Sequence, residues 1–164
     1  MTVKVVVIMG VSGSGKTTIG KGFAKATGWA FEEGDRWHPP ANIEKMRAGI
    51  PLGDEDRWPW LDALSGAIHE WIAADRRTVL ACSALKQAYR DRLSGGRLEV
   101  AFAYLRGTRE LVGDRVSRRR HEYMPPTLLP SQFAALEEPT DAIPLDIAKS
   151  PRRLIEQLRR TLGV

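Results

Sequence analysis

The sequence contains little cysteine and lacks long apolar runs. Cys82 is the one cysteine among 164 residues, which excludes an internal disulfide framework and is typical of a reducing compartment. The apolar run at residues 3–9 includes Lys4 and is too short to span a membrane. A small-residue cleavage site is missing before the glycines that follow it, so we do not expect a signal peptide. We therefore expect a cytoplasmic protein without a membrane partner.

Two kinds of nucleotide-switch motif are also missing. Neither D-x-x-G nor N-K-x-D occurs anywhere in the chain, which argues against a GTPase switch. The apolar segment "TVLACSA" at residues 78–84 reads as a strand, but it ends in Cys82 and Ser83 rather than in an aspartate of the Walker-B kind. If the protein binds a metal–nucleotide complex, the second acid near the metal must come from another segment.

The formal net charge of +5 allows two interpretations. A basic protein can bind nucleic acid, or it can be an enzyme whose arginines neutralise anionic substrates. The densest basic run, 118–120, lies inside the chain, and no aromatic stacking platform accompanies it. We favour the enzyme and expect no nucleic-acid partner, while a basic nucleotide-dependent nucleic-acid-binding module stays open as an alternative.

Apolar strand-like segments alternate with amphipathic helical segments along the chain. The clearest helix is 59–75, where apolar residues recur with the 3.6-residue period. This alternation predicts an α/β protein, a three-layer single domain over 1–164 with a five-stranded parallel sheet flanked by helices. Segments 36–77 and 106–141 are too long for simple crossovers, so we expect an acceptor-binding region at about 35–60 and a lid at about 118–130. Strands are predicted at 3–9, 29–33, 78–84, 99–105 and 142–147.

The stretch "GVSGSGKTT" fits the phosphate-loop pattern G-x-x-x-x-G-K-[ST] between a buried strand and a helix. Glycines let the backbone N–H groups turn toward phosphate oxygens, and the helix that follows adds its positive end. We expect Lys16 to reach the β- and γ-phosphates of ATP and Thr17 to be a ligand of Mg²⁺. The predicted nucleotide-binding residues are Gly10, Ser12, Gly13, Ser14, Gly15, Lys16, Thr17 and Thr18.

Asp35 follows the second predicted strand, at the edge where open α/β sheets bind ligands. There it would orient an acceptor hydroxyl, take its proton, or hold Mg²⁺ through water. A turn or helix-capping role after Gly34 is the alternative.

Beyond Asp35 the sequence resembles the gluconate kinase family, small P-loop kinases of the nucleoside-monophosphate-kinase-like fold. The motifs that carry the resemblance span most of the chain: "GVSGSGKTT", "GDRWHPPANIEKMRAGIPLGDEDRWPWL", "CSALKQAYRDRL", "MPPTLLPSQFAALEEP" and "LDI". The resemblance implies ATP-dependent phosphorylation of D-gluconate to 6-phospho-D-gluconate, and it suggests a homodimer. A shikimate- or nucleotide-directed kinase of the same fold is the alternative within the enzymes.

A gluconate site needs cations for the carboxylate and hydrogen-bonding partners for the hydroxyls. A guanidinium can bind a carboxylate through two parallel hydrogen bonds. Surface or capping roles are the alternative for each candidate. The predicted substrate-binding residues are Asp35, His38, Asn42, Arg57, Lys86 and Arg90.

In the predicted lid, Arg115 and Arg119 are four residues apart and share one helix face. The resemblance suggests that Arg115 stacks on adenine and that Arg119 stabilises the charge of the transition state. Arg118 or Arg120 is an alternative for the second role, and a solvated basic face is the alternative for both. The family usually has a histidine where this chain has Glu122, so we transfer no lid contact to that position. The predicted catalytic residues are Lys16, Asp35 and Arg119.

Overall fold

The computed structural model describes residues 2–118 and 126–164. Within these residues the five predicted strands form one parallel sheet in the order β2-β3-β1-β4-β5. The strands are β1 (Val5–Met9), β2 (Ala30–Glu33), β3 (Thr78–Ala81), β4 (Val100–Arg106) and β5 (Ile143–Asp146). The prediction of an α/β fold with a five-stranded parallel sheet is confirmed.

Strand β1 lies at the centre of the sheet, and all five of its residues are buried. Its sequence is apolar on both faces because helices cover both. It pairs with β3 on one side, where Val5 lies opposite Thr78, and with β4 on the other, where Val5 lies opposite Val100. The chain therefore leaves β1 in the middle of the carboxyl edge of the sheet, where ligands bind in open α/β folds.

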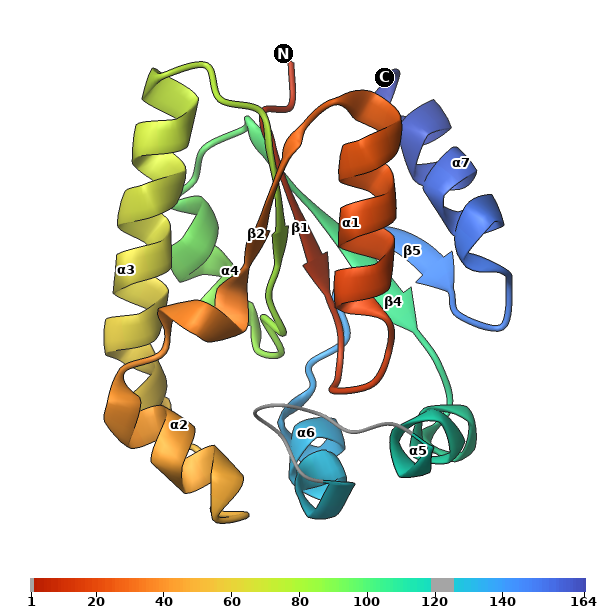
Figure 1. Cartoon of the computed structure of the whole chain (residues 1–164). Coiled ribbons are helices and arrows are strands. Elements are labelled where there is room, and N and C mark those ends of the chain that lie inside the picture. The colour runs from red at the N-terminus through yellow and green to blue at the C-terminus, as the bar shows by residue number, and fades with distance from the viewer. Residues whose placement is uncertain (1, 119–125) are drawn as a thin grey trace.

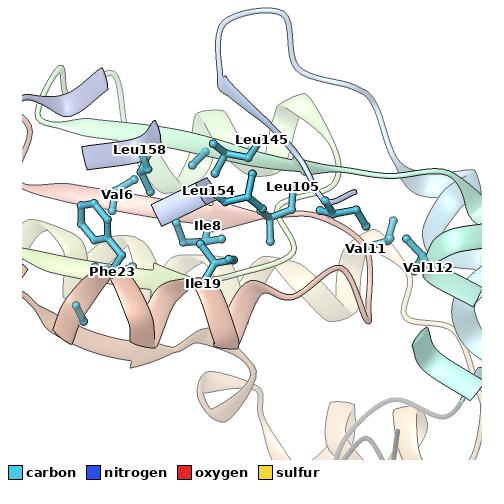
Figure 2. Packing of buried hydrophobic residues seen from close by; sticks show 14 of the residues in the cluster. Val6, Ile8, Val11, Ile19, Phe23, Leu105, Val112, Leu145, Leu154 and Leu158 are labelled. Carbon is cyan, nitrogen blue, oxygen red and sulfur yellow. The ribbon is translucent and has the colours of Figure 1, made fainter. Parts of the chain in front are cut away.

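Two hydrophobic cores separate the sheet from its helices. Helices α1 (Lys16–Thr27) and α7 (Pro151–Leu162) cover one face, and α3 (Asp54–Ala73) and α4 (Gln87–Ser94) cover the other (Figure 1). Figure 2 shows the first core, where side chains of β1, α1 and α7 meet. Its labelled members include Val6, Ile8, Ile19, Phe23, Leu154 and Leu158. None of the described helices has the length and apolar character that crossing a membrane would require.

Helix α3 begins at Asp54, five residues before the predicted start at Pro59, and in this detail the prediction is wrong. Asp54, Glu55 and Asp56 form an acidic first turn that suits the positive end of a helix. The Asp56 carboxylate also accepts a hydrogen bond from the Gly53 N–H at 2.9 Å. The added turn carries Arg57, which is buried.

Five short elements lie beyond the carboxyl ends of the strands (Figure 1). They are η1 (Gly34–Trp37), α2 (Pro40–Arg47), α5 (Arg109–Ser117), η2 (Pro126–Leu128) and α6 (Leu129–Ala135). The described part of the segment predicted as a lid, from Pro126 on, is a 3₁₀ turn leading into a helix. Leu128 is buried there because it packs with Met46 and Leu52 in a small third core. The region after β2 and the region before α6 therefore contact each other.

Candidate active site

The phosphate loop connects β1 to α1. At two of its glycines, a side chain would clash with neighbouring atoms or strain the backbone. Gly13 has φ +80°, and a Cβ there would lie 2.2 Å from Cγ2 of Val116 on α5. Gly15, with φ +104°, occupies the N-cap position of α1 and gives no side-chain cap. The N–H groups in the first turn of α1 are thus left for an external acceptor, which is the usual arrangement for binding phosphate.

Lys16 lies within the curve of this loop. Its Nζ donates to the carbonyl oxygens of Gly10 at 3.1 Å and Val11 at 2.9 Å. Burial lowers the pKa of Lys16, and the nearby carboxylates of Asp35 and Glu33 oppose that shift. A buried cation among loop carbonyls is stabilised further when a phosphate group supplies negative charge.

An acid that we did not predict lies beside the phosphate loop. The Thr17 hydroxyl donates to Glu33 Oε2 at 2.5 Å. Burial raises the pKa of Glu33, and the Thr17 hydrogen bond partly offsets this. Glu33 ends β2, two residues before Asp35, and it supplies an acid beside Thr17, whereas β3 ends without one. The sequence signal for this acid is the pair Glu33 and Asp35, separated by one glycine. If Asp35 lies at the ligand edge just after β2, then Glu33, the last residue of β2, lies there as well.

Asp35 reaches the site because the end of β2 comes very close to β3. A Cβ on Gly34 would lie 2.4 Å from the carbonyl oxygen of Ala81, so only glycine permits this approach. The Trp60 indole N–H fixes the turn by donating to the Gly34 carbonyl at 2.8 Å. Asp35 then lines the same pocket as Lys16.

This pocket lies between the phosphate loop, η1, α3 and α6 and encloses about 510 Å³ of space, including part that is open to solvent. One wall belongs to the phosphate loop, and the others carry acid, imidazole, guanidinium and amide groups. The polar lining residues are Ser12, Lys16, Asp35, His38, Arg57, Ser83, Ser131 and Gln132.

His38 is a neutral imidazole in this pocket. Burial and the positive charge of Arg57 lower its pKa to about 3. The ring stacks on Trp60 with centroids 3.9 Å apart. Asn42 Nδ2 lies 3.2 Å from His38 Nδ1 and 2.7 Å from the Asp56 carbonyl oxygen, and it donates to both. Because Nδ1 accepts, the ring hydrogen is on Nε2, and Asn42 thereby orients His38. Direct binding of a hydroxyl by Asn42 stays a prediction.

Arg57 is held by a chain of polar contacts from the pocket to the surface. Its Nη1 donates to the Tyr89 hydroxyl at 3.1 Å, and its guanidinium lies 5.4 Å from the centre of the Tyr89 ring. The Tyr89 hydroxyl donates in turn to Asp54. Lys86 Nζ donates to the same carboxylate at 3.0 Å, at the surface rather than in the pocket lining. A guanidinium has five N–H donors, so Arg57 keeps donors for a ligand.

Arg90 lies away from the pocket lining and is buried among protein oxygens. Nη1 donates to the carbonyls of Ala84 at 2.8 Å and Leu85 at 3.1 Å. Nη2 donates to Gln87 Oε1 at 3.2 Å and to the Glu137 carbonyl at 2.8 Å. The structure therefore does not bring this predicted substrate-binding residue to the pocket. It connects the segment after β3 to the segment after α6.

A second pocket, which encloses about 540 Å³ of space including part that is open to solvent, lies beside the first turn of α1. Its lining includes Ser14, Gly15, Thr18 and Arg115. Arg115 Nη2 donates to the Ile147 carbonyl at 2.7 Å, which fixes the guanidinium at the wall of that pocket. Of the other predicted lid residues, Arg119, Arg120 and Glu122 lie outside the described residues.

A phosphate loop at the centre of a five-stranded parallel sheet, with two acids beside it and a polar pocket next to its lysine, defines a P-loop kinase. Comparison with known proteins narrows this class. No family model matches the chain. A gluconokinase of Gluconobacter oxydans is 46% identical over 157 residues, covering 94% of this chain and 88% of that protein. The chain belongs to the gluconokinase family.

Two solved structures agree with this assignment. A sugar kinase from Janibacter, in an unliganded structure, is 47% identical with a TM-score of 0.92 and covers 99% of this chain and 95% of that one. A gluconokinase from Sinorhizobium meliloti is 39% identical with a TM-score of 0.84, covering 99% and 94% of the two chains. Likeness of this degree extends over the acceptor region as well as the phosphate loop.

Proposed function

We propose that this protein transfers the γ-phosphoryl group of ATP to the primary hydroxyl of D-gluconate, giving ADP and 6-phospho-D-gluconate. The observation that carries the proposal is the single pocket that contains Lys16 of the phosphate loop, Asp35 at the end of β2 and Arg57 of α3. The residues needed for a phosphoryl donor, a hydroxyl and a carboxylate thus line one space. Membership of the gluconokinase family supports the choice of sugar acid.

On the donor side, the loop N–H groups and Lys16 bind the phosphates, and Arg115 contacts the adenine from the second pocket. Thr17 and Glu33 offer hard oxygen atoms, which fit Mg²⁺, a cation that keeps several waters and binds substrate phosphates. When bound, Mg²⁺ supplies charge neutralisation at the phosphate oxygens. Thr17 and Glu33 would hold it, and their mutual hydrogen bond orients them beforehand.

On the acceptor side, Arg57 binds the carboxylate of gluconate, and the Nε2–H of His38 donates to a hydroxyl. Asp35 orients the primary alcohol and takes its proton as the bond to phosphorus forms. Most of the rate enhancement then comes from positioning and from charge stabilisation by Lys16. For this arrangement the neutral state of His38 is useful, because it adds a donor without adding charge next to Arg57.

Several further features belong to the same proposal. The chain acts as one kinase domain over 1–164, with an acceptor-binding region at about 35–60 and a lid at about 118–130. Arg119 of that lid stabilises the charge of the transferring group. The active form is a cytoplasmic homodimer that binds neither nucleic acid nor a membrane.

The test is ADP release measured against a panel of acceptors. D-gluconate should support turnover with a phosphate on its primary hydroxyl, whereas shikimate and nucleoside monophosphates should not. D-glucitol, which lacks the carboxylate, should be at least about tenfold poorer in kcat/KM, as expected when a buried cation is left unpaired. Turnover with shikimate or a nucleotide but not gluconate would assign the chain to another substrate class. Salt-sensitive binding of DNA or RNA would support the alternative from outside the kinases.

A further inference from the structure

A contact between α6 and the phosphate loop has no part in the mechanism above. Gln132 and Ser12 are 120 positions apart in the sequence, and both are buried, with 4% and 5% of their surfaces exposed. Gln132 Oε1 accepts the backbone N–H of Ser12 at 3.3 Å. Only the oxygen of the amide can accept, so the amide nitrogen is the part of this side chain left for a ligand.

Helix α6 is also anchored at its other end. The Glu137 N–H donates to the Leu85 carbonyl at 2.8 Å, and the Glu137 carboxylate accepts from the Gln87 N–H at 2.9 Å. Arg90 donates to the Glu137 carbonyl at 2.8 Å. Gln132 is thus fixed between the phosphate loop and the segment after β3, and its position is defined before any ligand binds.

The Ser12 hydroxyl is an independent sign of a missing partner. Its Oγ is fully buried and has no hydrogen bond to any residue within 2–118 and 126–164. An unpaired buried hydroxyl destabilises a protein and calls for an explanation. Ser12 lines the pocket together with Gln132, Lys16 and Asp35, so a ligand in that pocket can supply the partner.

We propose that the Ser12 hydroxyl and the Gln132 amide bind the phosphoryl group while it is transferred. This inference rests on the proposed function. In the step, the bond between the γ-phosphorus and the bridging oxygen breaks, and ADP leaves with the electron pair. The acceptor oxygen forms the new bond to phosphorus and its proton passes to Asp35. Ser12 and Gln132 donate hydrogen bonds to equatorial oxygens of the moving group, beside the charge of Lys16.

Neutral donors suit this place in the pocket. The transferring group spreads its charge over three equatorial oxygens, and Lys16 is shared with the loop carbonyls. A hydroxyl and an amide add donors without lowering the affinity of the adjacent acid for a proton. Removing one such fixed donor commonly costs about 10²–10³ in kcat.

Ser12→Ala and Gln132→Glu test the proposal. Ser12→Ala removes the hydroxyl but keeps the N–H that Gln132 accepts, and Gln132→Glu keeps an acceptor for that N–H but removes the donor. Each should lower kcat at least about tenfold and weaken binding of ADP with aluminium fluoride, a mimic of the planar phosphoryl group, by a similar factor. Affinity for ADP alone should change less than about threefold. The Tm of Ser12→Ala should equal or exceed that of the wild type.

Gln157→Ala is the control, because the Gln157 amide also makes one hydrogen bond to the backbone, its Nε2 donating to the Pro144 carbonyl at 3.0 Å, but it lies on α7 outside the lining of the pocket. It should keep wild-type kinetics. The proposal is overturned if Ser12→Ala and Gln132→Glu keep wild-type kcat and wild-type affinity for ADP with aluminium fluoride. It is equally overturned if their losses in ADP affinity and Tm account for the loss in kcat. If the wild type fails to phosphorylate gluconate, the proposed function is lost, while the aluminium fluoride measurement still decides the role of Ser12 and Gln132.

Discussion

Thr17 and Glu33 form a 2.5 Å hydrogen bond between the first turn of α1 and the end of β2. This contact places a carboxylate where β3 has none, since β3 runs into Cys82 and Ser83 instead of an aspartate. In the proposed mechanism the acid on the metal–phosphate side therefore comes from β2 rather than from β3. Glu33, one glycine before Asp35, would act on the metal side and Asp35 on the acceptor side.

Replacing Glu33 by glutamine should raise the Mg²⁺ concentration for half-maximal activity by about 10- to 100-fold, as expected for loss of a group that orients a metal ligand. The amide keeps a hydrogen-bond acceptor for Thr17 but loses the charge. Measuring initial rates against Mg²⁺ at fixed total ATP checks this. Glu32→Gln is the matched control, because Glu32 is the neighbouring acid and pairs with Arg76 at 3.1 Å. Equal Mg²⁺ requirements in both variants would remove Glu33 from the metal side.

Replacing Asp35 by asparagine should lower kcat at least about tenfold with a small change in KM for ATP, because a general base or orienting group acts on the chemical step. Steady-state kinetics with saturating gluconate measure this. Asp62→Asn, which affects an exposed ion pair with Arg92, is the control. Near-normal turnover of Asp35→Asn would exclude the proposed role. Lys16→Ala should abolish transfer altogether, since the loop then lacks its cation.

The sheet and its phosphate loop could be predicted because their signals are local. An apolar β-branched strand, a glycine-rich turn and an amphipathic helix each depend on neighbours in sequence. The start of α3 was misjudged for the same reason: Pro59 is a strong local signal, whereas the acidic turn before it is stabilised by the Gly53–Asp56 contact and by burial of Arg57.

The candidate site was less predictable because residue type does not reveal which partners a side chain meets. Arg57 and Arg90 are equally suitable cations in sequence, but Arg90 is surrounded by carbonyl oxygens and Arg57 lines the pocket. The contact of Gln132 with Ser12 joins residues 120 positions apart and leaves no local pattern. Only the path of the chain in three dimensions separates these cases.

The two arginines should respond differently to substitution. Arg57→Met should raise the KM for gluconate at least about tenfold, because a buried cation that pairs with a carboxylate is worth roughly 2–5 kcal/mol. Arg90→Met should instead destabilise the fold by about 2–3 kcal/mol, because it leaves buried carbonyls unpaired. Urea unfolding and gluconate kinetics on both variants separate these outcomes. A large KM effect with unchanged stability for Arg90→Met would restore it as a substrate-binding residue.

The hydroxyl of Tyr89 should affect gluconate binding because it orients Arg57. It accepts from Arg57 and donates to Asp54, so it fixes the guanidinium in one orientation. Tyr89→Phe should raise the KM for gluconate by about three- to tenfold, because Arg57 loses one orienting hydrogen bond worth about 1 kcal/mol, with kcat nearly unchanged. Tyr104→Phe is the control, since Tyr104 lies on β4 and its hydroxyl donates to Glu138 at 3.0 Å. A loss confined to kcat would contradict a role in binding the carboxylate.

His38 should make the fold less stable in acid. Its pKa is about 3 in the folded protein against an ordinary value of 6.5, so the unfolded chain binds more protons between these two pH values. The stability contributed by the neutral ring is therefore complete above about pH 6.5 and is lost as the pH falls toward 3, with a slope of at most about 1.4 kcal/mol per pH unit.

Urea unfolding at pH 7.5 and pH 5 measures this slope. His38→Gln should lose less stability between the two pH values than the wild type by about 1–2 kcal/mol, because glutamine has no proton to gain. His69→Gln is the matched control, since His69 is exposed on α3. If His38→Gln and His69→Gln showed the same pH dependence as the wild type, the imidazole would carry a proton in the folded state at pH 5. The strong lowering of the His38 pKa by burial and by Arg57 would then be wrong.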